Sequence, residues 1–404
     1  MADQLSSSFE ELTKAKRVPG IGAIVLDKSG KRLYDSSFGT LNANEDNAKP
    51  FTNDTQLLIW SCTKLITSLC TLQLVEQGKI SLNDPVKKYL TKDDFQVCER
   101  LDENRQPVLR KPKTEMTLLH LITHTSGLTY DFFGDDKLMH DYRAAKDQPR
   151  GAYLNPSAEW QYNDVFLAFD PGVRHHYGTN IDRLGFIIEE VSGLKLEDYI
   201  AKNICEPLGM KNTGPQFQGD DWLKVHLKDG EGKLTAVEAI QPAKEPWKYG
   251  GGHFLCSSLS DYSQVLLALL NEGKHPGTGK SILKPETVKD YVFKDLIPEV
   301  GCTGDGIGVI SAPSLVPGVS NAGDVGSIMS AVPRGWSAGL MINNEDASSA
   351  RKAGSGAWAG LGNLYYIVDP KSGVAGIIGT SIMPFLDSDV VGLFEKMEKF
   401  AYAG

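Results

Sequence analysis

The sequence predicts an α/β protein of the α+β kind, in which one antiparallel sheet is built from both ends of the chain. Three observations lead to this class. Strand-like apolar runs occur near the N-terminus, similar runs fill the C-terminal third, and the segment between them is rich in helix signals. We therefore expect helices to flank the sheet and a mostly helical domain to be inserted into it.

The strands are predicted from short apolar runs bounded by turn residues. Near the N-terminus, IGAIVLD (21–27) and KRLYDSSFGT (31–40) flank a KSG turn and indicate a hairpin. In the C-terminal third the β-like runs are WSAGLMIN (336–343), GAWAGLGNLYYIVD (356–369) and GVAGIIGTSI (373–382). The turn PKSG joins the last two runs, and KMEKFAYAG (396–404) suggests a short closing helix.

Helix signals fill the middle of the chain. The run TLLHLITH (117–124) stops at TSG, and apolar residues repeat at helical spacing through 181–191. Ser260 is expected to cap a helix that ends at Gly273. We divide the chain into a discontinuous sheet domain, residues 1–90 and 236–404, and a helical domain, residues 91–235, with the candidate site between them.

Composition narrows the classes of partner. The 404 residues carry a net charge of −9 without a basic cluster, which argues against nucleic acid and anionic membrane surfaces. The polar N-terminus lacks a secretory signal and no apolar run approaches about 18 residues, so we expect a cytoplasmic protein that does not bind membranes. The six cysteines have no CxxC or zinc-site spacing, so we expect free buried thiols, no metal and no cofactor.

One charged residue interrupts an otherwise apolar stretch, LLIWSCTKLITSLCTLQLVEQG (57–78). Lys64 follows Ser61 by three places, so the two side chains share one face of the expected helix. Apolar residues cover nearly the whole surface of that helix, which predicts that it is buried and that the amine is desolvated. Burial favours the neutral amine, which could take the proton of Ser61, while the start of the helix favours a developing oxyanion.

The bare SxxK pattern is weak because it occurs four times, at Ser61, Ser192, Ser281 and Ser349. The other three lie at a helix stop, before a proline and in a polar loop, so only Ser61 opens a buried helix. The alternative for the helix alone is a capping serine with a lysine that extends to solvent.

Several segments together resemble a known superfamily. SCTK on an apolar helix, THTSGL (123–128), HHYGTN with Tyr177 and the late WAG (358–360) resemble the serine β-lactamase and penicillin-binding superfamily, over about residues 17–400. The order and spacing are similar to class C β-lactamases and their esterase relatives. The stretches TKLITSL, LLHLITHTSGLTY, PGVRHHYGTNIDRLG and IVDPKSG resemble fungal polyketide acyltransferases and esterases of the lovastatin-pathway type. This resemblance implies a β-lactamase/transpeptidase-like fold.

The resemblance also implies roles for individual residues. Ser61 would be the acylated nucleophile and Lys64 its general base. Tyr177 falls on the second-motif tyrosine and would exchange a proton with Ser61 and the leaving group. The backbone N–H groups of Ser61 and Leu361 would form the oxyanion hole. From the residues alone, a half-buried structural tyrosine and a bulged core strand remain the alternatives for Tyr177 and for GAWAGLG.

Two departures from the penicillin-recognising pattern point to an apolar acyl group. The third motif, a Lys-Thr-Gly or similar, is replaced here by Trp358, Ala359 and Gly360, so its cation is gone. The second-motif asparagine, Asn180, comes one place late. Trp358 would give the acyl group a flat wall, and further candidates for its pocket, with core packing as the alternative, are Tyr130, Phe132, Phe133 and Tyr249.

These observations favour a serine esterase or acyltransferase that cleaves or transfers the acyl group of a small metabolite's ester or thioester. An acyl carrier protein is a candidate donor. Two alternatives remain: a β-lactamase or D-Ala peptidase, and a penicillin-fold binding protein without catalysis. His124, in THTSGL, is expected to hold a turn after its helix, so no Ser-His pair is predicted.

Overall fold

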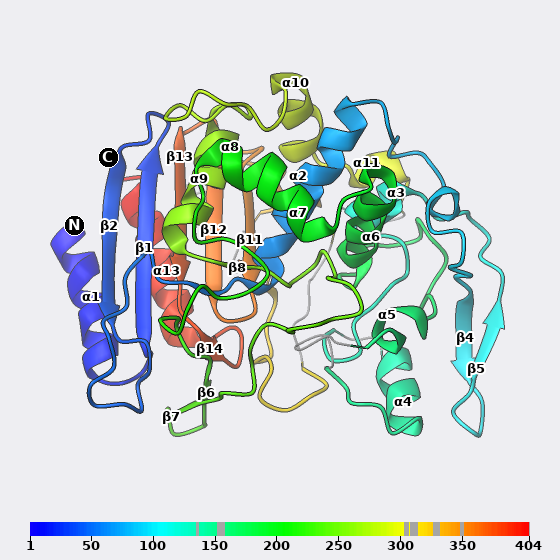
Figure 1. Cartoon of the computed structure of the whole chain (residues 1–404), viewed down its shortest axis with the longest axis horizontal. Helices are drawn as coiled ribbons and strands as arrows, with labels where there is room; N and C mark the ends of the chain where they lie inside the picture. The colour runs from blue at the N-terminus through cyan, green and yellow to red at the C-terminus, as the bar shows by residue number, and fades with distance from the viewer. Residues whose placement is uncertain are drawn as a thin grey trace.

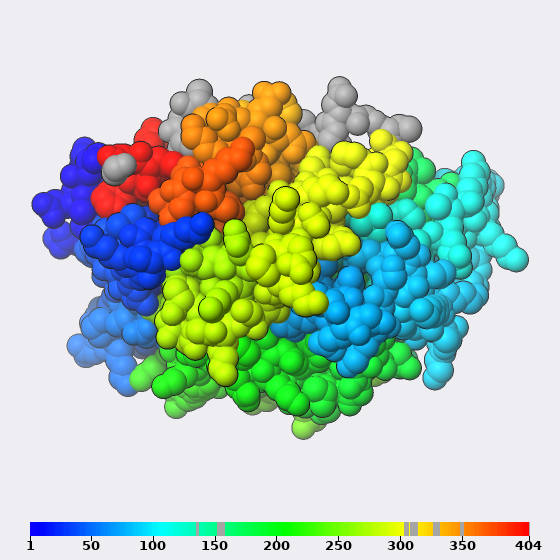
Figure 2. Space-filling view, turned by 90° about the horizontal axis from the view of Figure 1, so that it is seen from above, coloured from blue at the N-terminus to red at the C-terminus, as the bar shows by residue number. Residues whose placement is uncertain are grey.

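The computed structural model describes residues 1–134, 137–151, 158–302, 307, 314–325, 332–347 and 351–403. Figure 1 shows a sheet with its helices at one end of the molecule and a mostly helical part at the other. In the space-filling view the N-terminal and C-terminal segments, blue and red, lie side by side at the sheet end (Figure 2).

The main sheet has seven antiparallel strands in the order β2-β1-β13-β12-β11-β10-β9. Their bounds are β1 Gly20–Asp27, β2 Arg32–Gly39, β9 Arg334–Trp336, β10 Met341–Asn343, β11 Gly356–Gly360, β12 Leu364–Asp369 and β13 Val374–Gly379. The N-terminal hairpin joins the C-terminal strands where Ile24 pairs with Ile377. The prediction of one antiparallel sheet built from both chain ends is confirmed.

Helices cover both faces of this sheet. Gly376 and Gly379 of β13 point to opposite faces of the sheet, because side-chain direction alternates along a strand. A Cβ at Gly376 would meet Met397 of α13 (Ser388–Ala401). A Cβ at Gly379 would meet Leu259 of α9 (Leu259–Leu270). The N-terminal helix α1 (Ala2–Lys14) packs beside α13 and buries Leu5 and Phe9. The sequence analysis missed α1 because its polar composition hides those two anchors.

Further helices and a hairpin lie beyond the sheet and its covering helices. The main elements are α2 (Thr63–Glu76), α3 (Leu118–Ile122), α4 (Leu138–Ala145), α5 (Trp160–Asn163), α6 (Asn180–Ser192), α7 (Leu196–Ile200), α8 (Glu206–Leu208), and the strands β4 (Val97–Leu101) and β5 (Pro107–Arg110). The buried helix α2 packs against α6 and so links the two halves. The division at residues 90/91 and 235/236 stays a prediction.

Smaller sheets and helices complete the fold. β3 (Leu57–Leu58) pairs with β8 (Cys256–Ser257), while β14 (Ile382–Met383), β6 (His226–Lys228) and β7 (Leu234–Ala236) form a three-stranded sheet. Short helices α10 (Pro285–Thr287) and α11 (Ile297–Val300) follow α9. In the part of the chain that the structure describes, no helix is both long enough and apolar enough to cross a membrane.

Several predicted element boundaries were wrong for identifiable reasons. The run 336–343 is two strands, because Gly339 adopts φ +96° in a turn between them, and 356–369 is also two strands, with Asn363 at φ +64°. Ser258, not Ser260, caps α9, through a bond from the Asp261 amide. The closing helix begins at Ser388, where the Asp387 side chain caps it.

Candidate active site

The chain before Ser61 is held in a conformation that the apolar pattern did not predict. Residues 57–58 are strand β3, which pairs with β8, so they do not extend the helix. Trp60 has φ +48°, an uncommon value for a bulky residue, and a 3₁₀ turn at Trp60–Cys62 leads into α2. Ser61 therefore stands on a constrained turn directly before the helix that carries Lys64.

Lys64 is buried, with 1% of its surface exposed. Its Nζ lies 3.1 Å from Ser61 Oγ, 2.9 Å from Tyr130 Oη and 2.9 Å from the Gly252 carbonyl oxygen. Among the described residues no carboxylate lies within 4.0 Å of this amine. The amine is thus buried against three oxygen atoms and has no carboxylate counter-ion among the described residues.

The three contacts of Lys64 suit a neutral amine as well as an ammonium ion. An ammonium would donate to all three oxygens. A neutral amine would donate to the Gly252 carbonyl, which can only accept, and its lone pair could accept from Ser61. The geometry therefore allows the proton of Ser61 Oγ to pass to Lys64 Nζ without movement of either residue.

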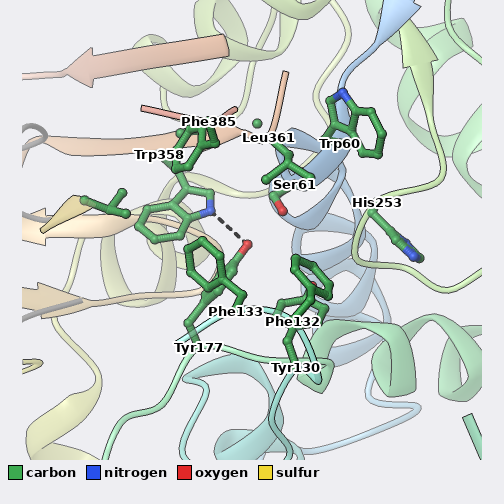
Figure 3. Close-up of a pocket in the computed structure, with 13 residues that line it drawn as sticks. Trp60, Ser61, Tyr130, Phe132, Phe133, Tyr177, His253, Trp358, Leu361 and Phe385 are labelled. Carbon is green, nitrogen blue, oxygen red and sulfur yellow. Dashed lines mark hydrogen bonds between the residues drawn. The ribbon is translucent and has the colours of Figure 1, made fainter. Parts of the chain in front are cut away.

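Tyr177 lies across the cavity from Ser61, and its hydroxyl accepts a hydrogen bond from Trp358 Nε1 at 3.3 Å (Figure 3). Its ring packs 4.8 Å, centroid to nitrogen, from Lys64 Nζ. The His124 ring also packs against the Tyr177 ring, with 4.7 Å between the two centroids. Its Nδ1 accepts a hydrogen bond from the Gly178 amide at 3.3 Å. His124 thus contacts the segment that carries Tyr177, whereas the sequence led us to expect that it holds the turn after its own helix.

Tyr130 occupies a position that the sequence did not predict. It was expected to line an acyl pocket, and it does border the cavity, but its hydroxyl also lies within hydrogen-bond distance of Lys64. Two phenols therefore flank the amine: Tyr130 through its oxygen and Tyr177 through its ring. Only the fold could reveal this difference, because both residues lie far from Lys64 in sequence.

The end of strand β11 approaches the Ser61 turn closely. A Cβ added at Gly360 would come within 2.6 Å of the Ile59 carbonyl oxygen and 3.1 Å of Cys62 Sγ. Glycine is therefore required here, and the close approach brings Leu361 beside Ser61 (Figure 3). This is where the sequence placed the second amide of an oxyanion hole.

These side chains line a mainly apolar cavity. It lies between the sheet and the helical part, and Ser61 and the Tyr177 hydroxyl face into it (Figure 3). The lining residues are Trp60, Ser61, Tyr130, Phe132, Phe133, Tyr177, His253, Val325, Trp358, Ala359, Gly360, Leu361 and Phe385. The lining includes every predicted site residue except Lys64 and Tyr249. Lys64 does not border the cavity itself, but its amine contacts Ser61 and Tyr130, which do.

Tyr249 does not line this cavity. Its ring stacks on Phe254, and its hydroxyl accepts from Gln216 Nε2 at 3.1 Å. Asn180 is likewise absent from the lining; it is buried and its side chain bonds to Ser126 Oγ and to the Leu128 carbonyl. Both residues hold neighbouring segments in place.

Four lining residues escaped the sequence analysis: Trp60, His253, Val325 and Phe385. Trp60 directly precedes the SCTK motif, so its position could have been suspected, whereas His253 follows three glycines that the sequence analysis did not consider. Val325 and Phe385 reach the cavity only through tertiary folding. The Phe385 amide donates to the Val319 carbonyl and the Asn321 amide donates to the Phe385 carbonyl, which ties the 314–325 segment to the region after β14.

The other SxxK patterns do not form comparable sites. Ser192 ends α6 and its hydroxyl accepts from the Leu194 amide, while Ser281 pairs with Lys274 in an isolated bridge. Ser349 lies outside the described residues. No group of three or more potential metal ligands occurs in the part of the chain that is described.

Burial sets the charge of the groups around Lys64. It lowers the pKa of His253 to about 4, and the neighbouring Asp182 carboxylate opposes this shift. The pKa of His124 falls well below its usual value for the same main reason, and that of the Cys62 thiol rises. Near pH 7 these groups are neutral.

Comparison with known proteins gives a consistent result. Residues 5–394 match the family described as Beta-lactamase. Monacolin J acid methylbutanoyltransferase of Aspergillus terreus is 28% identical over 414 aligned residues, covering 99% of this chain and 95% of that protein. Lovastatin esterase of Penicillium rubens is 25% identical, covering 96% and 94% of the two chains. The structure of simvastatin synthase LovD from Aspergillus terreus, in its LovD6 mutant, aligns with a TM-score of 0.80 at 26% identity and covers 100% of this chain and 94% of that one.

Proposed function

This chain belongs to the β-lactamase family, and we propose that it is a serine esterase or acyltransferase in which Ser61, Lys64 and Tyr177 form the catalytic centre. The observation that carries this proposal is the Lys64 amine, buried without a carboxylate partner among the described residues and 3.1 Å from Ser61 Oγ. A lysine held in this way is suited to act as a base.

In the first step Ser61 Oγ attacks the carbonyl carbon of an ester or thioester while its proton passes to Lys64 Nζ. The resulting oxyanion is stabilised by the backbone N–H groups of Ser61 and Leu361, which the close approach of β11 supports. Both donors belong to elements fixed by pairing and packing, so they need no rearrangement as charge develops.

In the second step the carbon–oxygen or carbon–sulfur bond breaks, and the leaving alcohol or thiol takes a proton. Tyr177 donates it, because its oxygen already accepts from Trp358 Nε1 and its own hydrogen is directed elsewhere. The proton that Lys64 took from Ser61 then restores the Tyr177 hydroxyl, so that the net result is one proton moved from Ser61 to the leaving group. The acyl group remains on Ser61 Oγ until water or an acceptor alcohol attacks it by the same steps in reverse.

The cavity indicates the class of acyl group. Its walls are aromatic and aliphatic, and Trp358 stands where penicillin-recognising enzymes carry a cation. A compact apolar acyl group fits this lining better than a carboxylated one. The named relatives include a methylbutanoyltransferase and an esterase, which supports both transfer to an alcohol and hydrolysis as fates of the acyl-enzyme.

A thioester on an acyl carrier protein is proposed as one donor, and a cytoplasmic location stays a prediction. Two observations count against the β-lactamase or peptidase alternative: Asn180 is buried away from the cavity, and the third-motif cation is absent. Nitrocefin hydrolysis at rates comparable with ester hydrolysis would restore it.

The proposal is tested by labelling with a fluorophosphonate probe and by p-nitrophenyl butyrate turnover. The wild-type protein should be labelled at Ser61, and Ser61→Ala should lose labelling and at least about a thousandfold in turnover while keeping its circular dichroism spectrum. Near-normal turnover by Ser61→Ala would refute the site, and absence of both labelling and turnover in the wild-type protein would favour the non-catalytic alternative.

A further inference from the structure

Three consecutive glycines, Gly250–Gly252, lie beside Lys64 and are only partly used by the mechanism above. They precede His253, which borders the cavity. The last of them supplies the carbonyl oxygen that lies 2.9 Å from Lys64 Nζ. The position of this peptide therefore helps to decide where the amine stands relative to Ser61.

The glycine run is clamped between α2 and α6. A Cβ at Gly250 would lie 2.1 Å from Asp182 Oδ1, and one at Gly252 would lie 2.8 Å from Asp182 Oδ2. A Cβ at Gly251 would meet the Ile181 carbonyl oxygen and Thr67 Cγ2, each at 2.7 Å. Any side chain would displace these contacts, so the three glycines allow the backbone to wrap closely around one carboxylate.

Hydrogen bonds fix the run on both sides. Thr67 Oγ1, one turn after Lys64 on α2, donates to the Gly251 carbonyl at 2.7 Å. The Gly252 amide donates to Asp182 Oδ1 at 3.3 Å. A connected path therefore leads from Asp182 through Gly252 to the Lys64 amine.

Asp182 is a buried charge with little compensation. Its residue is 1% exposed, and it stands in the first turn of α6, where the helix dipole favours an anion. The His253 ring lies 3.6 Å from Oδ1, but its pKa of about 4 leaves it neutral near pH 7. The Gly252 peptide connects Asp182 to Lys64, whose amine has no carboxylate within 4.0 Å among the described residues.

We propose that Asp182 is a positioning residue for Lys64: it fixes the Gly252 peptide against the amine and stabilises the ammonium ion that forms when Ser61 is deprotonated. This inference rests on the proposed function, because it assigns Asp182 a role only if Lys64 is the base. It also explains the GGGH sequence, which the proposed chemistry otherwise leaves without a reason.

The pH dependence of the rate separates this role from a purely structural one. With Lys64 as the base, a proton on its amine stops the reaction, and a neighbouring negative charge favours the protonated form of any amine. Removal of the charge should move the acid limb to lower pH. Burial lowers the pKa values of the two neighbouring histidines, so they are neutral above about pH 5. The titratable groups that face Asp182 and Lys64 are His253, His124, Cys62, Tyr130, Tyr177 and, near Gly250, Tyr162.

The experiment measures kcat/KM against pH for p-nitrophenyl butyrate with the wild-type protein and two variants. Asp182→Asn keeps an acceptor for the Gly252 amide and loses the charge. We expect its acid limb to shift down by roughly one pH unit and its plateau kcat to fall roughly tenfold. The matched control is Asp170→Asn, which removes a buried carboxylate paired with Arg110 outside the cavity and should leave the acid limb in place.

An unshifted acid limb in a folded Asp182→Asn protein overturns the inference. If that variant does not fold, Thr67→Val decides: it loosens the clamp without changing a charge, and we expect kcat to fall at least about fivefold at constant KM and an unmoved acid limb. An unchanged kcat in Thr67→Val overturns the inference instead. Lys64→Met separates the two proposals, because near-normal activity in that variant refutes the proposed function itself, whatever Asp182→Asn does.

Discussion

At the scale of single residues, the account depends on Lys64 being both necessary for chemistry and unfavourable for stability. A buried amine without a carboxylate partner stabilises little, and its replacement by an apolar residue of similar length removes a desolvation cost. Function and stability should therefore respond in opposite directions at this position.

Lys64→Met tests this opposition. We expect p-nitrophenyl ester turnover to fall at least about a thousandfold, because Ser61 loses its base, while the melting temperature stays unchanged or rises. Turnover and thermal unfolding followed by circular dichroism measure the two effects. A large loss of stability together with retained activity would contradict this role of Lys64.

The two tyrosines near Lys64 should differ in their contribution. Tyr177→Phe removes the proposed acid and should lower kcat by about 10² to 10⁴, whereas Tyr130→Phe removes one hydrogen bond to Lys64 and should lower kcat by about tenfold. Steady-state kinetics with the same ester gives both values. A larger loss in Tyr130→Phe would mean that Tyr130 carries the proton and that the sequence-based choice of Tyr177 was mistaken.

At the scale of secondary-structure elements, the site depends on how closely β11 approaches the turn before α2. Gly360→Ala would place a methyl group 2.6 Å from the Ile59 carbonyl oxygen, a backbone atom that cannot move alone. We expect β11 to shift away from Ser61 and kcat to fall at least tenfold, since roughly 1 Å of misplacement is enough for losses of that size.

Gly392→Ala is the control for this substitution. Gly392 lies inside α13 with no atom near an added Cβ, so alanine should leave turnover unchanged and raise the melting temperature slightly. Equal turnover in Gly360→Ala and the wild-type protein would show that the approach of β11 does not matter for catalysis.

The elements also show what sequence patterns can and cannot predict. The hairpin at 21–40 and helix α6 were predicted because local turn residues and apolar spacing specify them. The strands 336–343 and 356–369 were not divided correctly, because the turns at Gly339 and Asn363 lie within apolar runs and only the backbone angles reveal them. Residues 57–58 pair with β8, a partner about 200 positions away that no local pattern indicates.

At the scale of the whole molecule, the fold assembles a site whose local parts were predictable and whose distant parts were not. Spacing made Ser61 and Lys64 candidates and motif order made Tyr177 one; their catalytic roles stay predictions. The Tyr130 contact, the Gly252 carbonyl and the wall residues Val325 and Phe385 come from segments brought together by folding. No local sequence pattern indicates that these groups meet at the cavity.

Buried histidines should make the stability of the whole molecule depend on pH. Burial lowers the pKa of His120 to about 4, and its Nδ1 accepts from the Thr117 amide at 3.0 Å, a bond that protonation would remove. The pKa of His175 is also lowered, to about 3. Because the unfolded chain binds protons near pH 6.5 and the folded chain does not, stability should be lost as the pH falls from about 6.5 toward 4.

Urea unfolding at pH 7.5 and pH 5.0 measures this loss, which we expect to be about 2 kcal/mol for each such histidine. His120→Gln keeps an acceptor that does not titrate, so the difference between the two pH values should be smaller in this variant. Comparison with the wild-type protein separates the loss of unfolding free energy caused by His120 from the loss caused by carboxylates that titrate in the same pH range. An identical difference in both proteins would show that His120 is not neutral in the folded state.

The most direct test of the central claim is the mass of the intact protein after incubation with a short-chain acyl thioester. The account predicts an increase equal to one acyl group, mapped by peptide analysis to Ser61, and no increase in Ser61→Ala. An adduct on another residue, or the same adduct in Ser61→Ala, would contradict it.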